Sequence, residues 1–254
     1  MPISKTQIDR LGDRLKSGDL TESDLRLLDD YRRSFGEAYE AVVEKIVRRG
    51  QAPTGRLAKS TLSIVDKLRR ESIRLSQMQD IAGCRVIVAD IAEQEDYVPA
   101  LAADFPGAVI IDRRDKPSHG YRAIHVIVEM SDKPIEIQVR TLLQHGWAEV
   151  SEKASDIIDP TIKYGGGSSL WQKFLEASSK SIAAFEALEK SYSKRLALLK
   201  QYSHDPTKEM LKVLERSKLE TEQLRTDLVR SRNETQSLLT RAISHLDELK
   251  RTTQ

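Results

Sequence analysis

Polar and apolar side chains alternate along residues 135–140 of this chain. The odd positions hold Ile, Ile and Val, whereas the even positions hold Glu136, Gln138 and Arg140. Successive side chains of a β-strand point to opposite faces of a sheet, so a strand here would gather the three polar groups on one face. A carboxylate, an amide and a guanidinium in one row can bind a metal ion or the phosphates of a nucleotide.

A second strand is expected before this one, across the turn at residues 131–134. Tyr121 and His125 stand four positions apart in it and would therefore share one of its faces. Gly120, directly before Tyr121, allows a backbone or a ligand to come close. If the two strands pair, these side chains join the polar row on one surface, which would suit a metal ion, a phosphate chain and a stacked base.

Asp80 and Glu136 are the candidate metal ligands. Mg²⁺ prefers oxygen ligands and is often held by one or two carboxylates together with phosphate and water. Asp80 precedes an apolar strand at residues 84–88, and Glu136 lies inside another strand. Two structural alternatives stay open, because Asp80 could cap its strand and Glu136 could form an ion pair with Arg85 or Arg140. No histidines and cysteines have the spacing of a zinc site.

A basic segment precedes Asp80. Residues 48–74 contain eight Lys and Arg residues against two acidic ones. Lys59, Ser63 and Lys67 stand at i, i+4 and i+8 and would share one face of a helix. The chain has no GxxxxGK[ST] loop, so side chains would have to bind any phosphates. Further candidates for that role are Arg56, Arg85 and Arg140. The alternative is an ordinary solvated helix face.

Four ordered motifs resemble the synthetase domain of the RelA/SpoT alarmone synthetases. They are GRLAKSTLSIVDKL at 55–68, MQDIAGCRVIV at 78–88, HGYRAIH at 119–125, and IEIQVRT followed by HGWAEVSE within 135–152. The resemblance covers roughly residues 40–155. Four motifs in the same order at sensible spacing are far more specific than a single glycine-rich loop.

The resemblance implies roles for individual residues. The basic helix would grip the phosphates of ATP. Asp80 and Glu136 would hold Mg²⁺ and act as the catalytic carboxylates, with Glu136 helping to deprotonate the acceptor hydroxyl. Tyr121 would stack on the guanine of the acceptor nucleotide. The ATP-binding candidates are Arg56, Lys59, Ser63, Lys67 and Arg85, and the acceptor-binding candidates are Tyr121, Lys116, His125, Gln138 and Arg140.

The pattern of the chain predicts the elements that position these residues. Helices are expected at 4–16, from about 21 to 49, and at 60–75, 92–105 and 142–157, with strands at 84–88, at 108–112 and in the hairpin. Strands interleaved with helices predict an α/β (α+β) fold with a mixed sheet flanked by helices. The resemblance implies a nucleotidyltransferase-like synthetase fold. We expect N-terminal helices at 1–50, a synthetase core at 51–160 and a helical tail at 170–254.

The C-terminal tail has a character of its own. The glycines at 165–167 predict a flexible joint, followed by a helix at 170–202 and a last helix that starts at residues 204–206. The best heptad seam of that last helix is half polar, which is typical of a weak coiled coil. The seam consists of Leu214, Ser217, Thr221, Leu224, Leu228, Ser231, Thr235, Leu238, Ala242, His245 and Leu249. The tail could pack on the domain, pair with a partner or lie largely in solvent.

Composition narrows the class of protein. The 254 residues are 39% hydrophobic, 31% charged and 5% aromatic, with a net charge of +2, which is typical of a soluble, helix-rich protein. The single cysteine, Cys84, excludes a disulfide within the chain and is expected to be buried. We find neither a signal peptide nor an apolar run of about 18 residues, so a cytoplasmic protein without a membrane span is expected.

The resemblance implies a GTP diphosphokinase of the stringent response. It would transfer pyrophosphate from ATP to the 3′-hydroxyl of GDP or GTP, giving (p)ppGpp and AMP. The N-terminal helices are too short for the hydrolase domain of longer relatives, so synthesis without hydrolysis is expected. One alternative is a toxic small synthetase that acts on adenosine nucleotides or on the 3′ end of tRNA. Another is a non-catalytic nucleotide-binding scaffold. The helical tail could bind a second copy of the chain or an antitoxin.

Overall fold

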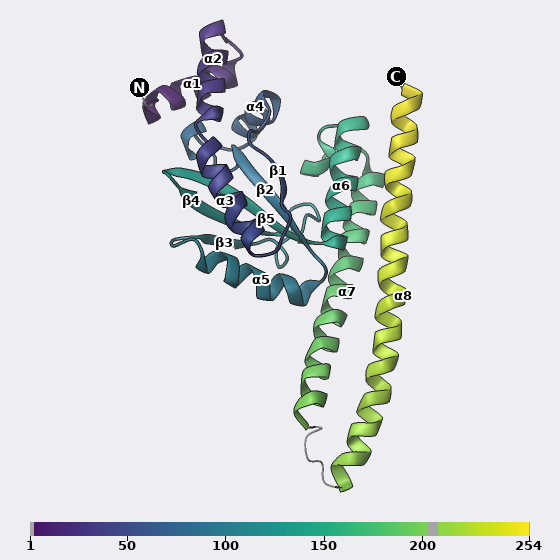
Figure 1. The fold of residues 1–254 in the computed structure, drawn as a ribbon. Helices are drawn as coiled ribbons and strands as arrows, with labels where there is room; N and C mark the ends of the chain where they lie inside the picture. The colour runs from purple at the N-terminus through teal and green to yellow at the C-terminus, as the bar shows by residue number, and fades with distance from the viewer. Residues whose placement is uncertain (1–2, 203–207, 254) are drawn as a thin grey trace. The chain divides into compact units, whose positions relative to one another are not determined.

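The computed structural model describes residues 3–202 and 208–253, without the side chains of residues 56, 208–210 and 253. Its helices and strands are labelled in Figure 1. In chain order they are α1 (Lys5–Ser17), α2 (Glu22–Arg33), α3 (Gly36–Arg48), β1 (Thr54–Arg56), α4 (Thr61–Arg70), η1 (Leu75–Gln77), β2 (Ala82–Val88), α5 (Ile91–Ala103), β3 (Val109–Asp112), β4 (Ile124–Met130), β5 (Lys133–Thr141), α6 (Leu142–Ile157), η2 (Ile162–Tyr164), α7 (Ser169–Tyr202) and α8 (Lys208–Thr253).

The chain divides into two compact units. The first comprises residues 1–86, 98–111 and 124–139, and the second comprises residues 87–97, 112–123 and 140–254. One five-stranded sheet, in the order β1-β2-β5-β4-β3, runs through the described part of the chain. The α+β class with a mixed sheet and helices is therefore confirmed.

The β4–β5 hairpin gives the sheet its register. Ile127 pairs with Glu136 and His125 with Gln138 in antiparallel register. The connection needs two residues with positive φ, and Ser131 and Asp132 supply φ values of 49° and 58°. The apolar residues of β5 are fully buried, whereas Glu136 and Gln138 are only half-buried. The predicted alternation is therefore confirmed for residues 135–139, but not for Arg140, which is buried.

The predicted helix at 21–49 is wrong, because two helices occupy this segment. Thr21 caps α2 with a capping box, and α2 ends before Ser34. Phe35, between the helices, is fully buried and meets the ring of Tyr31 edge-on at 5.2 Å. The Ser34 hydroxyl donates to the carbonyl of Tyr31 at 2.6 Å, which satisfies an acceptor of the last turn. Burial of Phe35 thus bends the chain where periodicity predicts continuity.

The basic helix is shorter than predicted. Ser60 caps α4, and the helix ends at Arg70 rather than near residue 75. Ile64 and Leu68 are buried as expected, but Leu62 is 77% exposed and does not belong to the apolar face. Leu75 lies instead in η1, where it is buried against α1. Together, α1, α4 and η1 form a helical layer of the first unit.

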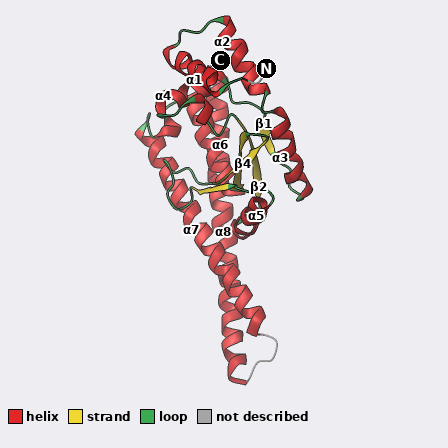
Figure 2. Ribbon diagram, turned by 90° about the vertical axis from the view of Figure 1, so that its left-hand side faces the viewer, coloured by secondary structure: helices red, strands yellow, loops and turns green. Residues whose placement is uncertain are grey.

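Helices α6, α7 and α8 pack side by side in the second unit (Figure 2). Their shared core contains Trp147 and Val150 of α6, Ile182 of α7 and Leu246 of α8. Trp147 is therefore a core residue. Of the three arrangements open for the tail, packing on the protein is the one observed. The predicted core–tail boundary at residue 160 lies within this unit.

The glycines at 165–167 form a packed turn rather than a flexible joint. Gly165 has a φ of 87°, and a Cβ there would collide with the ring of His119. A Cβ on Gly166 would lie 2.5 Å from the hydroxyl of Thr161. Gln172 further donates to the carbonyl of Gly166 at 2.6 Å. Only glycine leaves enough space for these close contacts.

The buried seam of α8 follows the predicted heptads only in its first half. Leu214, Thr221, Leu228 and Thr235 are buried at seven-residue intervals. The seam then shifts by one residue, because Leu239 and Leu246 are buried in place of Leu238 and His245. A straight helix has 3.6 residues per turn and drifts out of a strict heptad register. The predicted helix start at residues 204–206 lies outside the described residues.

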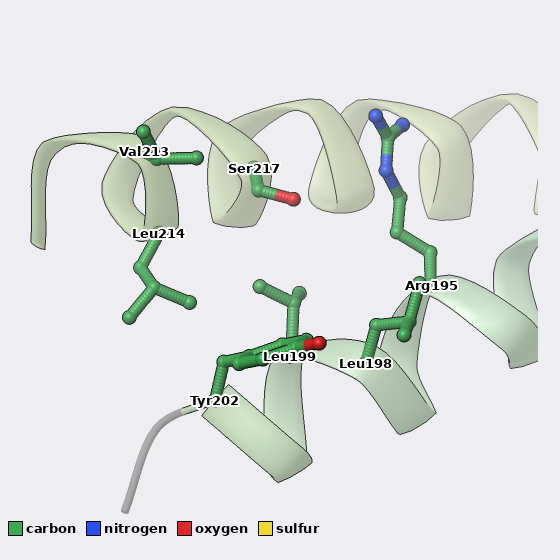
Figure 3. Close-up of a pocket in the computed structure, with 7 residues that line it drawn as sticks. All are labelled: Arg195, Leu198, Leu199, Tyr202, Val213, Leu214 and Ser217. Atoms are coloured by element: carbon green, nitrogen blue, oxygen red, sulfur yellow. The ribbon is translucent and has the colours of Figure 1, made fainter. Parts of the chain in front are cut away.

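An open apolar groove of about 510 Å³ lies where α7 and α8 approach residues 203–207 (Figure 3). It is lined by Arg195, Leu198, Leu199, Tyr202, Val213, Leu214 and Ser217. None of the candidate site residues lines this groove. None of the described helices combines the length and the apolar character that a bilayer crossing requires.

Candidate active site

Two lysines converge on Asp80 in the first unit. Lys59 Nζ lies 2.6 Å from one carboxylate oxygen of Asp80, and Lys67 Nζ lies 2.9 Å from the other. The backbone N–H of Lys59 donates to the carbonyl of Ile81 at 2.7 Å, which holds the residue beside the start of β2. Lys67 comes from the last turn of α4. The structure thus brings two predicted ATP-binding residues onto a predicted metal ligand.

The Asp80 carboxyl is ionised at neutral pH. Burial alone would raise its pKa, but the positive charges of Lys59 and Lys67 and their hydrogen bonds outweigh this effect. The net result is a pKa below the ordinary value for aspartate. All three side chains are mostly buried, so solvent screens the ion pairs only partly. Asp80 is therefore an ion-pairing residue rather than only a strand cap.

Glu136 is a second, half-buried carboxylate. His125 Nδ1 lies 2.8 Å from one of its oxygens, and the amide of Gln138 donates to the other at 2.7 Å. Burial raises the pKa of Glu136, the contact with His125 lowers it, and the negative charge of Asp80 raises it again. The net shift is downward, so Glu136 is also ionised. Its contacts include His125 and Gln138, which bond one oxygen each.

The donor set around these carboxylates fits a magnesium ion. Asp80 and Glu136 supply ionised oxygens, and each carboxylate oxygen keeps a further lone pair beside the bond it already accepts. Within the described residues no group of three or more His, Cys, Asp and Glu could hold a metal. A site with two carboxylates matches Mg²⁺ that is completed by phosphate and water. Burial and the charge of Glu136 raise the pKa of Cys84 to about 12, which leaves no thiolate ligand.

The other predicted ATP-binding residues take separate positions. The Ser63 amide donates to the Ser60 hydroxyl at 3.2 Å, and the Ser60 hydroxyl donates to that of Ser63 at 2.8 Å. Ser63 therefore belongs to the N-terminal cap of α4. Arg85 is half-buried on β2, in register with Thr54 of β1. Arg56 ends β1, and its side chain lies outside the described part of the structure.

Tyr121 and Arg140 form a pair in the second unit. The guanidinium of Arg140 donates to the tyrosine hydroxyl at 2.9 Å and lies 5.1 Å from the centre of the ring. The ring of Trp147 is tilted against Tyr121 at 6.4 Å. Arg140 is buried, whereas Lys116 in the same loop as Tyr121 is exposed. Two predicted acceptor-binding residues are therefore in direct contact.

Tyr121 does not lie on a strand, so its predicted place on β4 is wrong. β4 begins only at Ile124. The backbone before it turns, with φ values of 51° at His119 and 88° at Gly120, and the Tyr121 amide donates to the carbonyl of Ser118 at 2.9 Å. A strand cannot pass through positive φ. The tyrosine is placed by a loop, and its period-2 relation to His125 is coincidental.

The segment that contains the Asp80 cluster and the Tyr121–Arg140 pair matches a known family. Residues 55–155 match the model described as "Region found in RelA / SpoT proteins". This segment is a RelA/SpoT region. The resemblance of the four motifs is therefore confirmed.

Curated relatives share this region. One protein of Mycobacterium bovis and two of Mycobacterium tuberculosis strains, each called uncharacterised, are 38% identical to this chain over 111 residues. The match covers 42% of this chain and 41% of each relative. The chain thus matches about two-fifths of the length of these relatives.

Three solved structures are similar to part of this chain. The small alarmone synthetase 1 of Bacillus subtilis is 23% identical and covers 70% of this chain and 99% of its own, with a TM-score of 0.48. A Streptococcus mutans protein is 28% identical over 65% of this chain and 93% of its own, with a TM-score of 0.45. The Bacillus synthetase bound to AMPCPP is 20% identical over 67% and 98%, with a TM-score of 0.42.

A buried polar network in the second unit escaped the sequence-based prediction. The Glu186 carboxylate accepts hydrogen bonds from Gln144 at 2.5 Å and from Arg122 at 2.7 Å. Gln144 also accepts a bond from Gln94 at 2.9 Å, and Arg114 donates to Gln94 at 3.2 Å. Glu186 lies in α7, beyond the end of the RelA/SpoT region. An acidic residue on the otherwise apolar face of α7 is the one signal in the sequence that could have indicated it.

Proposed function

We propose that this protein is an alarmone synthetase that transfers pyrophosphate from ATP to the 3′-hydroxyl of GDP or GTP. The observation that carries the proposal is the convergence of Lys59 and Lys67 on the ionised Asp80, in a segment that matches the RelA/SpoT region. Phosphoryl-type transfer depends mainly on positioning and on charge stabilisation. Preformed cations and carboxylates are the groups that this chemistry needs.

The lysines would bind the phosphates of ATP. Asp80 holds both ammonium groups in place. A polyphosphate carries more negative charge than one carboxylate, so Lys59 and Lys67 can exchange part of their bonding to it. Asp80 and Glu136 would hold Mg²⁺ together with the phosphates. The bound ion would supply charge neutralisation on the phosphate oxygens.

The acceptor oxygen attacks the β-phosphorus of ATP, and the bond between that phosphorus and the α,β-bridging oxygen breaks. AMP leaves with this bridging oxygen, and the product carries the pyrophosphate on its 3′-oxygen. Glu136 would take the proton of the acceptor hydroxyl. His125 and Gln138 hold the two oxygens of Glu136, so they orient its carboxylate. A loose transition state requires only a weak base, which agrees with the lowered pKa of Glu136.

Tyr121 would stack on the base of the acceptor, with Arg140 fixing the ring through its hydroxyl. Lys116 is exposed in the same loop and can reach a phosphate of the bound acceptor. Gln138, which donates to Glu136, would also contact the acceptor nucleotide. Arg140 also brings a positive charge to this group.

Transfer from labelled ATP to a panel of acceptors tests the proposal. GDP, GTP, ADP, ATP and deacylated tRNA would each be supplied with Mg²⁺, and the products would be separated by chromatography. We expect AMP release together with a 3′-pyrophosphorylated guanosine nucleotide. Label in adenosine nucleotides or in the tRNA 3′ end would instead identify a toxic small synthetase. No transfer to any acceptor, despite measurable ATP binding, would identify a nucleotide-binding scaffold.

A further inference from the structure

Helix α7 contacts the loop of Tyr121 on both sides of that residue. The Ser179 hydroxyl donates a 2.7 Å hydrogen bond to the carbonyl oxygen of Gly120. The Glu186 carboxylate accepts a 2.7 Å bond from the guanidinium of Arg122. Gly120 and Arg122 are the chain neighbours of Tyr121. α7 therefore holds the backbone just before the tyrosine and the side chain just after it.

Both residues of α7 are buried. Ser179 and Glu186 are each 5% exposed, and the side chain of Arg122 is 12% exposed. Gln144 of α6 donates to the second oxygen of Glu186, so both of its oxygens are bonded. A buried charge is costly unless a partner and hydrogen bonds satisfy it. Removing the charge of Glu186 would leave the buried guanidinium of Arg122 without its counter-ion.

The shape of the loop also depends on these helices. A Cβ on Gly120 would lie 2.7 Å from the indole of Trp147 and 3.2 Å from the carbonyl oxygen of Leu175. Trp147 donates its indole N–H to that same carbonyl at 2.9 Å. Arg122 donates to the carbonyl of Arg114 at 2.6 Å, which ties the end of the loop to its beginning. The loop is thus packed against α6 and α7 without space for a side chain at residue 120.

We propose that Ser179 and Glu186 are positioning residues for the acceptor nucleotide, and this inference rests on the proposed role of Tyr121. Together they form a clamp on the loop, defined here as the bonds Ser179–Gly120 and Glu186–Arg122. Both residues lie beyond residue 155, where the RelA/SpoT region ends. The tail helix α7 thereby completes the acceptor-binding part of the protein. A ring that stacks on a base must keep its position to within a fraction of an ångström, and the clamp fixes the residues on both sides of the Tyr121 ring.

Amide hydrogen exchange of the full-length protein tests the clamp without any substrate. Glu186→Gln and Ser179→Ala should speed exchange in the loop, where Tyr121 donates to Ser118 and Arg113 donates to Ala123. We expect about a tenfold increase for Glu186→Gln, because hydrogen bonds to charged groups contribute this much or more. Exchange in β2 and β5 of the first unit should not change.

Matched controls come from the exposed face of α7. Glu176 bonds the exposed Lys180, and Ser181 bonds the carbonyl of Ala177, so Glu176→Gln and Ser181→Ala make the same chemical changes away from the loop. These variants should leave loop exchange at the wild-type rate. Unchanged exchange in both Glu186→Gln and Ser179→Ala would overturn the clamp. If Glu186→Gln fails to fold, loop exchange in Ser179→Ala alone tests whether the clamp exists.

Steady-state kinetics with the acceptor used by the wild type test the positioning role. Glu186→Gln should raise the KM for the acceptor about tenfold and leave the KM for ATP within about twofold. Combining it with Arg122→Gln should raise the KM for the acceptor by less than the product of the two single effects, because the two changes share the Glu186–Arg122 bond, although Arg122→Gln also breaks the bond to the carbonyl of Arg114. Equal effects on both KM values, or none on either, would overturn the positioning role. If the wild type transfers to no acceptor, the proposed function fails, and loop exchange still decides whether the clamp exists.

Discussion

The ammonium group of Lys67 lies 2.9 Å from a carboxylate oxygen of Asp80, although the two residues come from a helix and from the turn before β2. Lys59 donates a hydrogen bond to the other oxygen, so a single carboxylate binds two ammonium groups. Under the proposed function, such a cluster would hold the lysines ready for a polyphosphate and restrict their rotamers before it binds. Preorganised charge of this kind is the main source of rate enhancement in phosphoryl transfer.

The carboxylates are expected to be essential for transfer. Asp80→Asn and Glu136→Gln keep the size of each side chain but remove its charge, so each should lower kcat/KM by more than about tenfold, which corresponds to roughly 1.4 kcal/mol. Mg²⁺ titrations of activity should show a weakened dependence in both variants. Asp66→Asn on the exposed side of α4 is the matched control. Full activity of either carboxylate variant would remove it from the site.

Low pH should reduce the contribution of the Asp80 ion pairs to the free energy of unfolding. The folded protein lowers the pKa of Asp80 below its unfolded value of about 3.9, so the ion pairs contribute stability above that value and lose it as pH falls through the folded pKa. Urea unfolding of the wild type and of Asp80→Asn measures this contribution. The difference in unfolding free energy should be constant from about pH 5 to 7 and shrink below about pH 4. A constant difference down to about pH 2 would contradict the assignment.

The two lysines should act on ATP rather than on the acceptor. Lys59→Ala or Lys67→Ala removes charge-assisted hydrogen bonds and should raise the KM for ATP about tenfold or more. Separate titrations of ATP and acceptor measure this effect. Lys180→Ala, at an exposed ion pair of α7, is the control for loss of a lysine charge. A defect confined to the acceptor titration would show that α4 serves the other substrate.

Lys59 lies before the cap of α4, so helical spacing does not explain its place beside Lys67. Local periodicity does predict the alternation of β5, which places Glu136 and Gln138 on one face. The helix at 142–157 is correct because Thr141 provides a capping box with Gln144. These features need no knowledge of distant contacts.

Sequence-based prediction fails at positions whose conformation depends on contacts with residues far away in the chain. Tyr121 leaves the strand because His119 and Gly120 adopt positive φ in a loop packed against other helices. Glu186 and Arg122 are 64 residues apart, and no local pattern links them. The break at Phe35 follows from burial of its ring in the first unit. Tertiary packing overrides periodicity at each of these positions.

Tyr121 should be required for acceptor binding. Tyr121→Ala removes a stacking surface worth about 1–3 kcal/mol, so the acceptor kcat/KM should fall roughly ten- to a hundredfold while ATP binding remains. Sequence alone predicts that Tyr121→Phe keeps most activity. The bond from Arg140 to the hydroxyl changes this expectation to an intermediate loss, because phenylalanine cannot accept it. Wild-type turnover of Tyr121→Ala would refute stacking.

The tail should be needed for folding of the second unit. A chain that ends after Pro160 lacks α7 and α8, which cover Trp147, Val150 and Ala154 of α6. Each large apolar side chain that becomes exposed costs about 1.5–3 kcal/mol, so several together exceed the stability of a typical domain. We expect this truncation to be insoluble or to bind a hydrophobic dye.

A shorter deletion is the control for this prediction. Ending the chain after Leu249 removes only exposed or terminal residues of α8 and leaves Leu246 in the core. This variant should unfold cooperatively, with a midpoint close to that of the full chain. A soluble, cooperatively folded protein ending at Pro160 would show that α6 does not need its cover. The clamp would then be testable by simple deletion, because loop exchange and the acceptor KM could be measured with α7 absent.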